Sequence, residues 1–179
     1  ILIVNARDLG SIIKEFKNHK INVMTGVNTL FNALLNNEKF NNIDFSELKI
    51  TVAGGMALQN TVATKWKDLT GCTLSEGYGM TESSPVASVN PVDGSAIMGT
   101  IGLPVPSTDM RVVDESGIKL GVGESGEIQI KGPQVMKGYY NKPEETANTI
   151  KDGWLCTGDI GIMDTNGFFK IVDRKKDMI

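Results

Sequence analysis

The amino-acid sequence predicts an α/β fold in which a parallel β-α-β sheet is followed by a β-rich subdomain with the character of a distorted barrel. Up to about residue 103, short β-branched runs alternate with apolar residues at helical spacing. From residue 104, short apolar runs are separated by turn residues instead. All six prolines stand at residue 85 or later. We therefore expect an α/β portion over residues 1–103 and a β-rich portion over residues 104–172.

The first portion is predicted to alternate strands with helices that cover the sheet. Asn28 is a candidate N-cap of the second helix, and the Asn-rich stretch 36–42 is predicted to be a polar surface loop. Strands are expected where β-branched residues cluster, at residues 2–4, 21–24, 49–52 and 73–76. Helices are expected where apolar side chains share one helical face, namely Ile12, Ile13 and Phe16, then Leu30, Phe31, Leu34 and Leu35, then Val62, Trp66 and Leu69.

The second portion is predicted to form an antiparallel sheet or a small open barrel. The dipeptide Asn166-Gly167 lies between two alternating runs, which is a strong hairpin signal. One short helix is expected over residues 144–150, directly after Pro143. Strands are expected at residues 110–113, 127–131, 160–163 and 168–172.

The composition of the 179 residues excludes several classes of function. With 18 basic and 21 acidic side chains the formal net charge is −3, which argues against binding to nucleic acid. Two cysteines cannot form a disulfide framework. The single histidine, His19, argues against a histidine-rich metal site and against Ser-His-Asp chemistry. No apolar run approaches the roughly 20 residues of a membrane span, so we expect a cytoplasmic protein.

Both ends of the chain lie within predicted structure. The sequence opens inside the first expected strand without an initiator Met, and it stops at residue 179 without a cap or polar tail. We therefore expect this chain to be a piece of a longer protein.

The first candidate binding feature is the glycine pair Gly54-Gly55, at the carboxyl end of a predicted central strand. Ligands bind at this edge of open α/β sheets, and glycines there allow a flat ring to approach the backbone. Taken alone, a tight strand-to-helix turn explains the pair at least as well.

The second feature, residues 76–83, follows the next strand and should open onto the same edge of the sheet. The Tyr78 ring can lie against a base, and the Thr81 hydroxyl can reach a phosphate or carboxylate oxygen. Glu82 is the kind of oxygen ligand that Mg²⁺ takes together with substrate phosphates. A glycine-rich loop with a solvated glutamate remains an alternative. No G-x-G-x-x-G opens a helix after a strand, which argues against an NAD site.

Two further features lie in the β-rich portion. Asp159 follows Thr157-Gly158, and such an acidic residue can accept hydrogen bonds from both hydroxyls of a ribose, although a turn residue bonding its own backbone is an alternative. Cys156 is interpreted as a packing residue, because nothing near it in sequence would lower its pKa. The charged cluster 173–177 would ordinarily be a solvated surface, but it follows the last strand directly.

In this order the motifs resemble the adenylate-forming superfamily of acyl-CoA synthetases, luciferases and peptide-synthetase adenylation domains, over essentially the whole chain. Within it, four stretches are similar to bacterial long-chain fatty-acid–CoA ligases: residues 25–35, 102–108, 131–136 and 171–179. The resemblance implies that this chain is part of the large N-terminal domain of an acyl-CoA synthetase, and that residues 173–179 begin an interdomain hinge. It also implies formation of acyl-AMP from a long-chain fatty acid and ATP with Mg²⁺, followed by transfer of the acyl group to coenzyme A.

The resemblance also implies roles for individual residues. Gly54 and Gly55 would lie beside the adenine and the acyl chain, and Lys176 would be the hinge about which a small C-terminal domain turns between the half-reactions. Gly79, Met80 and Val86 would face the acyl pocket, with Gly79 also counted among the nucleotide-binding residues. The remaining nucleotide-binding residues would be Tyr78 on the adenine, Thr81 by the α-phosphate, Glu82 on Mg²⁺, Asp159 on the ribose hydroxyls and Arg174 nearby.

This chain departs from the family pattern in two ways. Ala57 stands where many relatives have proline and Cys156 where His or Arg is common. The glycine-rich phosphate loop and the distal catalytic lysine of the family are not in this chain, so we expect it to be inactive alone. Two alternatives stay open, a ligase for acyl or aryl acids of another length and a non-catalytic binding fragment. The sequence does not fix oligomeric state. Because a long-chain acid is delivered from a bilayer, peripheral membrane association of the full protein at the inner face of the cytoplasmic membrane stays open, although no amphipathic basic helix in this chain supports it.

Overall fold

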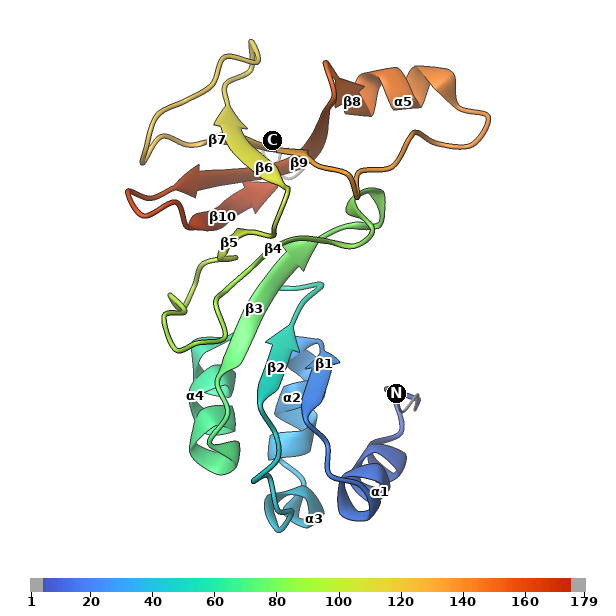
Figure 1. Cartoon of the computed structure of the whole chain (residues 1–179), viewed down its shortest axis with the longest axis vertical. Coiled ribbons are helices and arrows are strands. Elements are labelled where there is room, and N and C mark those ends of the chain that lie inside the picture. The colour runs from blue at the N-terminus through green and yellow to red at the C-terminus, as the bar shows by residue number, and fades with distance from the viewer. Residues whose placement is uncertain (1–4, 175–179) are drawn as a thin grey trace. The chain divides into compact units, whose positions relative to one another are not determined.

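The computed structural model describes residues 5–174, which form two compact units (Figure 1). The first unit holds the described residues up to Glu76 together with Pro91–Gly99. The second holds Gly77–Asn90 and the described residues from Thr100 onward. The expected boundary at residue 103 concerns the domains of a longer protein and stays a prediction. None of the helices within residues 5–174 combines the length and apolar character of a membrane span.

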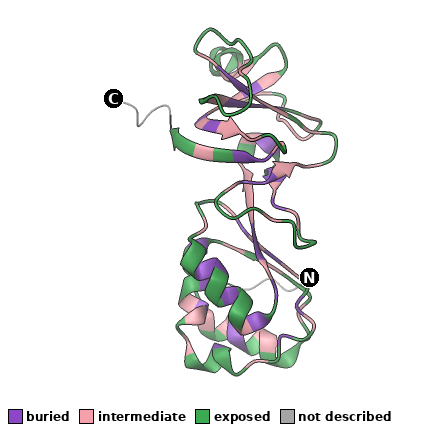
Figure 2. Cartoon of the chain, turned by 90° about the vertical axis from the view of Figure 1, so that its left-hand side faces the viewer, coloured by how far each residue is buried: buried purple, intermediate pink, exposed green. Residues whose placement is uncertain are grey.

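The first unit is a parallel sheet covered by helices, as predicted. Strand β2 pairs in parallel with β1 on one side and with β3 on the other. Figures 1 and 2 show α2 and α4 on the same face of this sheet. The expected strand at residues 2–4 lies outside the described residues. The strands are β1 (Val23–Gly26), β2 (Ile50–Ala53) and β3 (Leu74–Gly79), and the helices are α1 (Leu9–Asn18), α2 (Asn28–Leu35), α3 (Glu38–Asn41) and α4 (Asn60–Thr70).

Aromatic side chains fill much of the core of the first unit. Phe31 of α2 meets Trp66 of α4 edge-on, with 4.7 Å between ring centroids, and Phe40 of α3 stacks on the same indole at 5.7 Å. The buried Trp66 Nε1–H donates to Thr51 Oγ1 of β2 at 3.2 Å, so the indole has a polar partner inside the core. These contacts join three helices to the central strand.

Two local predictions for this unit are wrong. Asn28 does not cap α2: the N-cap is Val27, and the buried Asn28 side chain accepts the Gln59 N–H at 3.0 Å. The stretch 36–42 is not only a loop, because it contains α3, whose N-cap Asn37 accepts the Lys39 N–H. This short helix carries Phe40, whose ring is fully buried in the aromatic core.

The second unit is β-rich, as predicted. The end of β3 pairs antiparallel with β4, which pairs with β5, and a second, antiparallel sheet has the order β10-β9-β7-β6 with β8 alongside β9. Strand β4 was not predicted. The strands are β4 (Val86–Val89), β5 (Leu103–Pro104), β6 (Asp109–Val113), β7 (Gly126–Lys131), β8 (Ile150–Lys151), β9 (Trp154–Met163) and β10 (Phe169–Arg174), and the helices are the 3₁₀ turn η1 (Thr81–Ser83) and α5 (Pro143–Thr149).

The predicted hairpin at Asn166-Gly167 is confirmed. Strands β9 and β10 are antiparallel, and Asp164 Oδ1 accepts the backbone N–H groups of Asn166 and Phe168 in the connecting turn. Asp114 Oδ1 accepts two backbone N–H groups in the same way, from Ser116 and Ile118. In both turns the aspartate accepts hydrogen bonds from backbone N–H groups that are not paired with the neighbouring strand.

Candidate functional site

Asp159 owes its position to a bulge in β9. Glu127 and Gln129 of β7 pair with Ile160 and Cys156, so three residues of β9 stand opposite the single residue Ile128. These three residues are the Thr-Gly-Asp motif, Thr157 to Asp159. The Thr157 hydroxyl donates to the Ile128 carbonyl at 2.7 Å and accepts the Asp159 N–H at 3.0 Å.

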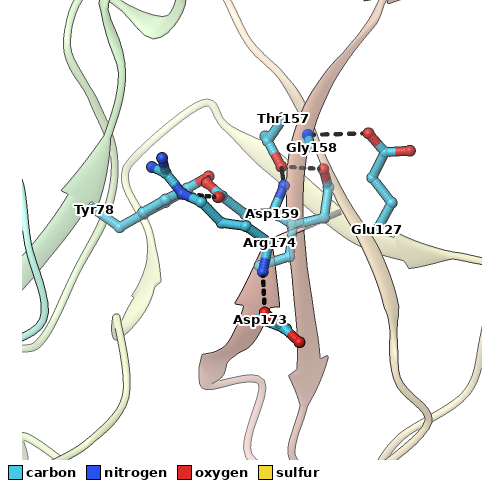
Figure 3. Close-up of polar contacts among 8 residues, drawn as sticks. Tyr78, Glu127, Thr157, Gly158, Asp159, Asp173 and Arg174 are labelled. Carbon is cyan, nitrogen blue, oxygen red and sulfur yellow. Dashed lines mark hydrogen bonds and ion pairs between the residues drawn. The ribbon is translucent and has the colours of Figure 1, made fainter. Parts of the chain in front are cut away.

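The backbone at the middle of this bulge favours glycine. Gly158 has a φ of 74°, a left-handed conformation that side chains disfavour, and its N–H donates to Glu127 Oε1 at 3.0 Å. The Thr157 hydroxyl and the Glu127 carboxylate therefore replace ladder hydrogen bonds that the bulge removes. Figure 3 shows both contacts around Asp159.

A second bulge places Arg174 beside the same carboxylate. On β10, Ile171 pairs with Gly161 and Asp173 with Ile160, which leaves Val172 as an extra residue. Arg174 is thereby directly opposite Asp159, and its Nε lies 3.0 Å from Asp159 Oδ1 (Figure 3). The guanidinium is exposed while the carboxylate is buried, so the arginine covers the carboxylate from the solvent side.

Tyr78 supplies the second donor to Asp159. Its hydroxyl donates to Asp159 Oδ2 at 2.6 Å, and it comes from the end of β3 (Figure 3). Burial raises the pKa of Tyr78 far above its ordinary value of 10, and the hydrogen bond to Asp159 and the charge of that carboxylate raise it further. Tyr78 is therefore a neutral donor near neutral pH. The buried Asp159 carboxylate has a donor on each oxygen and, with about four lone-pair positions, can accept further hydroxyl groups.

Thr81 and Glu82 lie on η1, which follows β3 directly. Ser83 is fully buried and fixes this turn, because its hydroxyl accepts the Met80 N–H at 3.1 Å and donates to the Pro85 carbonyl at 2.8 Å. Thr81 is exposed and Glu82 is half-buried. Two oxygen-bearing side chains are thus presented next to one another at the end of the strand that carries Tyr78.

Glu82 has a partner that the sequence did not predict. Tyr139, in the segment before α5, donates its hydroxyl to Glu82 Oε1 at 2.6 Å. This hydrogen bond raises the pKa of Tyr139, with a smaller contribution from burial. No local pattern around Tyr139 signals the contact, since it joins residues that are 57 positions apart.

The glycine pair lies in the first unit, at the carboxyl end of β2. Gly54 donates its N–H to the Gly26 carbonyl at 3.0 Å, and Gly55 has a φ of 78°, so the pair forms a turn that favours glycine. Glu76 of β3 pairs with Ala53 at the same edge and accepts the Leu58 N–H at 3.2 Å. Burial raises the pKa of Glu76, although the bond from Leu58 acts in the opposite direction.

The remaining predicted residues are placed as follows. A Cβ on Gly79 would lie 1.7 Å from the Pro85 carbonyl oxygen, so close backbone packing requires glycine there and its contact with a ligand stays a prediction. Met80 packs against the core of the second unit, whereas Val86 is exposed. Cys156 accepts a hydrogen bond from Gln129 Nε2 at 3.3 Å. Lys176 lies outside the described residues.

The structure thus brings three predicted nucleotide-binding residues together in the second unit, namely Tyr78, Asp159 and Arg174. Thr81 and Glu82 follow on η1 of the same unit. Across residues 5–174, no group of three or more His, Cys, Asp or Glu side chains is arranged to hold a metal ion.

Comparison with known sequences identifies a family and several proteins that are similar to this chain. A family model described as AMP-binding enzyme matches residues 2–140. The long-chain-fatty-acid–CoA ligase of Haemophilus influenzae is 54% identical over 179 residues, which is 100% of this chain and 32% of that protein. The chain spans about a third of the length of such curated relatives.

Comparison with solved structures gives the same fold. MatB from Rhodopseudomonas palustris in its ATP-bound form matches with a TM-score of 0.85 and 32% identity, over 96% of this chain and 34% of that one. The anthranilate CoA ligase AuaEII in complex with anthranoyl-AMP matches with a TM-score of 0.90 and 26% identity, over 100% of this chain and 34% of that one. The α/β and β-rich architecture is therefore shared with the ATP-bound MatB and with the anthranilate CoA ligase.

Proposed function

This chain belongs to the family of AMP-binding enzymes, and on that premise we propose that the protein carrying it is an ATP-dependent long-chain fatty-acid–CoA ligase. The observation that carries the proposal is the 54% identity, over all 179 residues, with the Haemophilus influenzae ligase of that name. The donor cluster around Asp159 supports it, because a buried carboxylate with a donor on each oxygen and lone pairs to spare is suited to bind ribose hydroxyls.

Roles in nucleotide binding are proposed for residues of each unit taken by itself. In the second, Asp159 accepts the ribose hydroxyls, Arg174 lies beside it, and the Tyr78 ring is the candidate face for the adenine. Gly54 and Gly55 of the first unit are proposed to lie beside the adenine and the acyl chain. The absence of their own side chains supports this role, because glycines allow a flat ring to approach the backbone at the end of β2.

Glu82 is proposed to hold Mg²⁺ together with the phosphates of ATP. Mg²⁺ in such sites is usually bound by one or two carboxylates and by substrate oxygens, and the half-buried Glu82 beside the exposed Thr81 fits that donor set. When bound, the ion would neutralise negative charge on the phosphates. Thr81 is proposed to contact the α-phosphate and the acyl carboxylate.

Two half-reactions follow from the proposal. In the first, an oxygen of the fatty-acid carboxylate attacks the α-phosphorus of ATP, and pyrophosphate leaves with the electron pair of the broken P–O bond. In the second, the thiol of coenzyme A attacks the acyl carbonyl, loses its proton and displaces AMP. Lys176, which lies outside the described residues, is proposed as the hinge that allows one site to serve both steps.

The experiment is ATP–pyrophosphate exchange by the full-length protein with a series of acids from short to long chain and with aryl acids. We expect exchange to rise with long-chain acids and acyl-CoA to form when coenzyme A is added. Equal rates for short and long acids would overturn the long-chain assignment. Preference for an aryl acid would favour the alternative to which the similarity with the anthranilate ligase points. No exchange with any acid would favour a non-catalytic role.

Two substitutions separate the half-reactions. Glu82→Ala should lower acid-dependent exchange on the order of 100-fold, because the site loses a charge-stabilising ligand. Glu115→Ala, in an exposed turn, is the matched control and should leave exchange unchanged. Lys176→Pro should spare exchange and suppress thioester formation. Unchanged rates of both half-reactions in Lys176→Pro would exclude the hinge role.

The proposed location is the cytoplasm, where ATP and coenzyme A are available.

A further inference from the structure

The hydrogen bond from Tyr139 to Glu82 connects two segments that are far apart in sequence. The Tyr139 hydroxyl lies 2.6 Å from Glu82 Oε1, which is a short distance typical of a hydroxyl donating to a charged carboxylate. Both side chains are half-buried, so the contact is partly shielded from water. Such bonds are roughly twice as strong as those between neutral groups.

The backbone around Tyr139 is fixed on both sides of the contact. Met136 donates its N–H to the backbone carbonyl of Glu82 at 2.8 Å, so one segment holds both the main chain and the carboxylate of this glutamate. The Thr146 hydroxyl of α5 accepts the Tyr139 N–H at 2.9 Å and donates to the Lys142 carbonyl at 2.8 Å. Tyr139 therefore reaches Glu82 from a closed and anchored loop.

A glutamate needs this kind of support if it is to act as a metal ligand. Its side chain has three rotatable bonds, and Mg²⁺ demands near-ideal octahedral geometry. Hydrogen bonds to a ligating carboxylate orient it, and removing such a partner typically lowers metal affinity about 10- to 100-fold. In this site the tyrosine hydroxyl engages Oε1, which leaves Oε2 to face another group.

We propose that Tyr139 is a positioning residue for Glu82, holding one carboxylate oxygen so that the other is presented to the Mg²⁺ that accompanies ATP. The inference rests on the proposed function of Glu82 as the magnesium ligand. Tyr139 contacts neither substrate nor metal in this account. Its effect passes through the Glu82 carboxylate alone.

The test is Tyr139→Phe in the full-length protein, because this change removes only the hydroxyl. We expect the Mg²⁺ concentration that gives half-maximal binding of ATP, measured by calorimetry, to rise about 10-fold. The concentration giving half-maximal acid-dependent pyrophosphate exchange should rise in parallel. Tyr140→Phe is the matched control, since Tyr140 is the next residue and is 89% exposed. Equal Mg²⁺ dependence in the two variants would overturn the proposal.

A double-mutant cycle distinguishes positioning from a general effect on folding. If Tyr139 acts only through Glu82, Tyr139→Phe should not change Mg²⁺-dependent ATP binding in a Glu82→Ala background. A further loss in that background would show that Tyr139 acts by another route and would overturn the inference. Normal Mg²⁺ dependence of Glu82→Ala alone would instead refute the proposed role of Glu82, which keeps the two failures distinguishable.

Discussion

Asp159 is a buried carboxylate whose charge is balanced by its neighbours. Only 4% of the residue is exposed, and its two oxygens meet the Tyr78 hydroxyl and the Arg174 guanidinium. A buried charge without partners is strongly destabilising, so these donors are needed before any ligand arrives. A ligand with hydroxyl groups would add to this set or replace one of its members.

Removing the Tyr78 hydroxyl should therefore destabilise the protein. We expect Tyr78→Phe to cost about 1.5–3 kcal/mol, the usual value for a hydrogen bond to a charged group. The loss should appear as a lower thermal unfolding midpoint of the full-length protein. Tyr140→Phe serves as the control because that side chain is exposed. An unchanged midpoint for Tyr78→Phe would mean that water or another donor replaces the hydroxyl.

The ionisation of Tyr78 provides a second measurement. Its pKa is raised in the folded state, so the stabilisation is complete below the unfolded-state pKa of about 10 and is lost as pH rises through the folded-state value. We expect the ultraviolet difference between wild type and Tyr78→Phe to show no tyrosinate step near pH 10 while circular dichroism still reports a folded protein. An ordinary step near pH 10 would contradict the buried hydrogen bond.

The bulge in β9 explains why threonine precedes Gly158-Asp159. The Thr157 hydroxyl donates to the Ile128 carbonyl and also accepts the Asp159 N–H. Without it, two backbone groups beside a buried carboxylate would lack a partner. The Thr157 hydroxyl therefore supports the bulge together with the Glu127 carboxylate.

Replacing the Thr157 hydroxyl with a methyl group tests this explanation. Thr157→Val keeps the shape of the side chain and should cost about 1–3 kcal/mol, while Thr157→Ser should retain most of the stability. Hydrogen exchange of a peptide from β9 in the full-length protein should be faster in the valine variant. Equal exchange in the valine and serine variants would show that the hydroxyl does not support the bulge.

The two compact units have separate cores of different composition. The first is built on the aromatic contacts of Phe31, Phe40 and Trp66, and the second on aliphatic residues of the antiparallel sheet such as Ile128 and Leu155. Each of these side chains is fully buried. Damage to one core should therefore affect its own unit first.

Phe40→Ala and Ile128→Ala form a matched pair for this prediction. The first should cost about 3–5 kcal/mol and the second about 2–5 kcal/mol, the usual effects of such truncations in a core. Hydrogen exchange in the full-length protein should increase in α2, α4 and β2 for Phe40→Ala, and in β6, β7 and β9 for Ile128→Ala. The same pattern of exchange in both variants would show that the two units unfold as one.

Much of this fold follows from local sequence patterns. The parallel strands, the helices with one apolar face and the Asn166-Gly167 hairpin are all encoded in periods of a few residues, and they were predicted. Asn28 was misread because its partner, the Gln59 N–H, is 31 positions away. Helix α3 was missed because the asparagines around Phe40 are typical of a polar loop, and a single apolar ring gives no helical period.

In the candidate site, too, the local motifs could be predicted and the long-range contacts could not. Tyr78 and Asp159 each stand in a glycine-containing motif at a strand end or bulge, so their chemistry could be inferred from their neighbours. Their hydrogen bond joins residues 81 positions apart and had no local signal. Tyr139 had neither a motif nor a local partner, and only the fold reveals its contact with Glu82.

Val172 is an extra residue in β10. The charge that stands opposite Asp159 therefore depends on the number of residues between Ile171 and Arg174. If pairing continued without a bulge from Ile171 and Gly161, Asp173 would stand opposite Asp159, and two carboxylates would repel each other where an ion pair now forms. Val172 itself is 48% exposed, so its side chain is free to vary. With the bulge kept, a one-residue insertion after Val172 would place Asp173 opposite Asp159 and reverse the charge there although no charged residue had changed, whereas deletion of Val172 together with the bulge would leave Arg174 opposite Asp159.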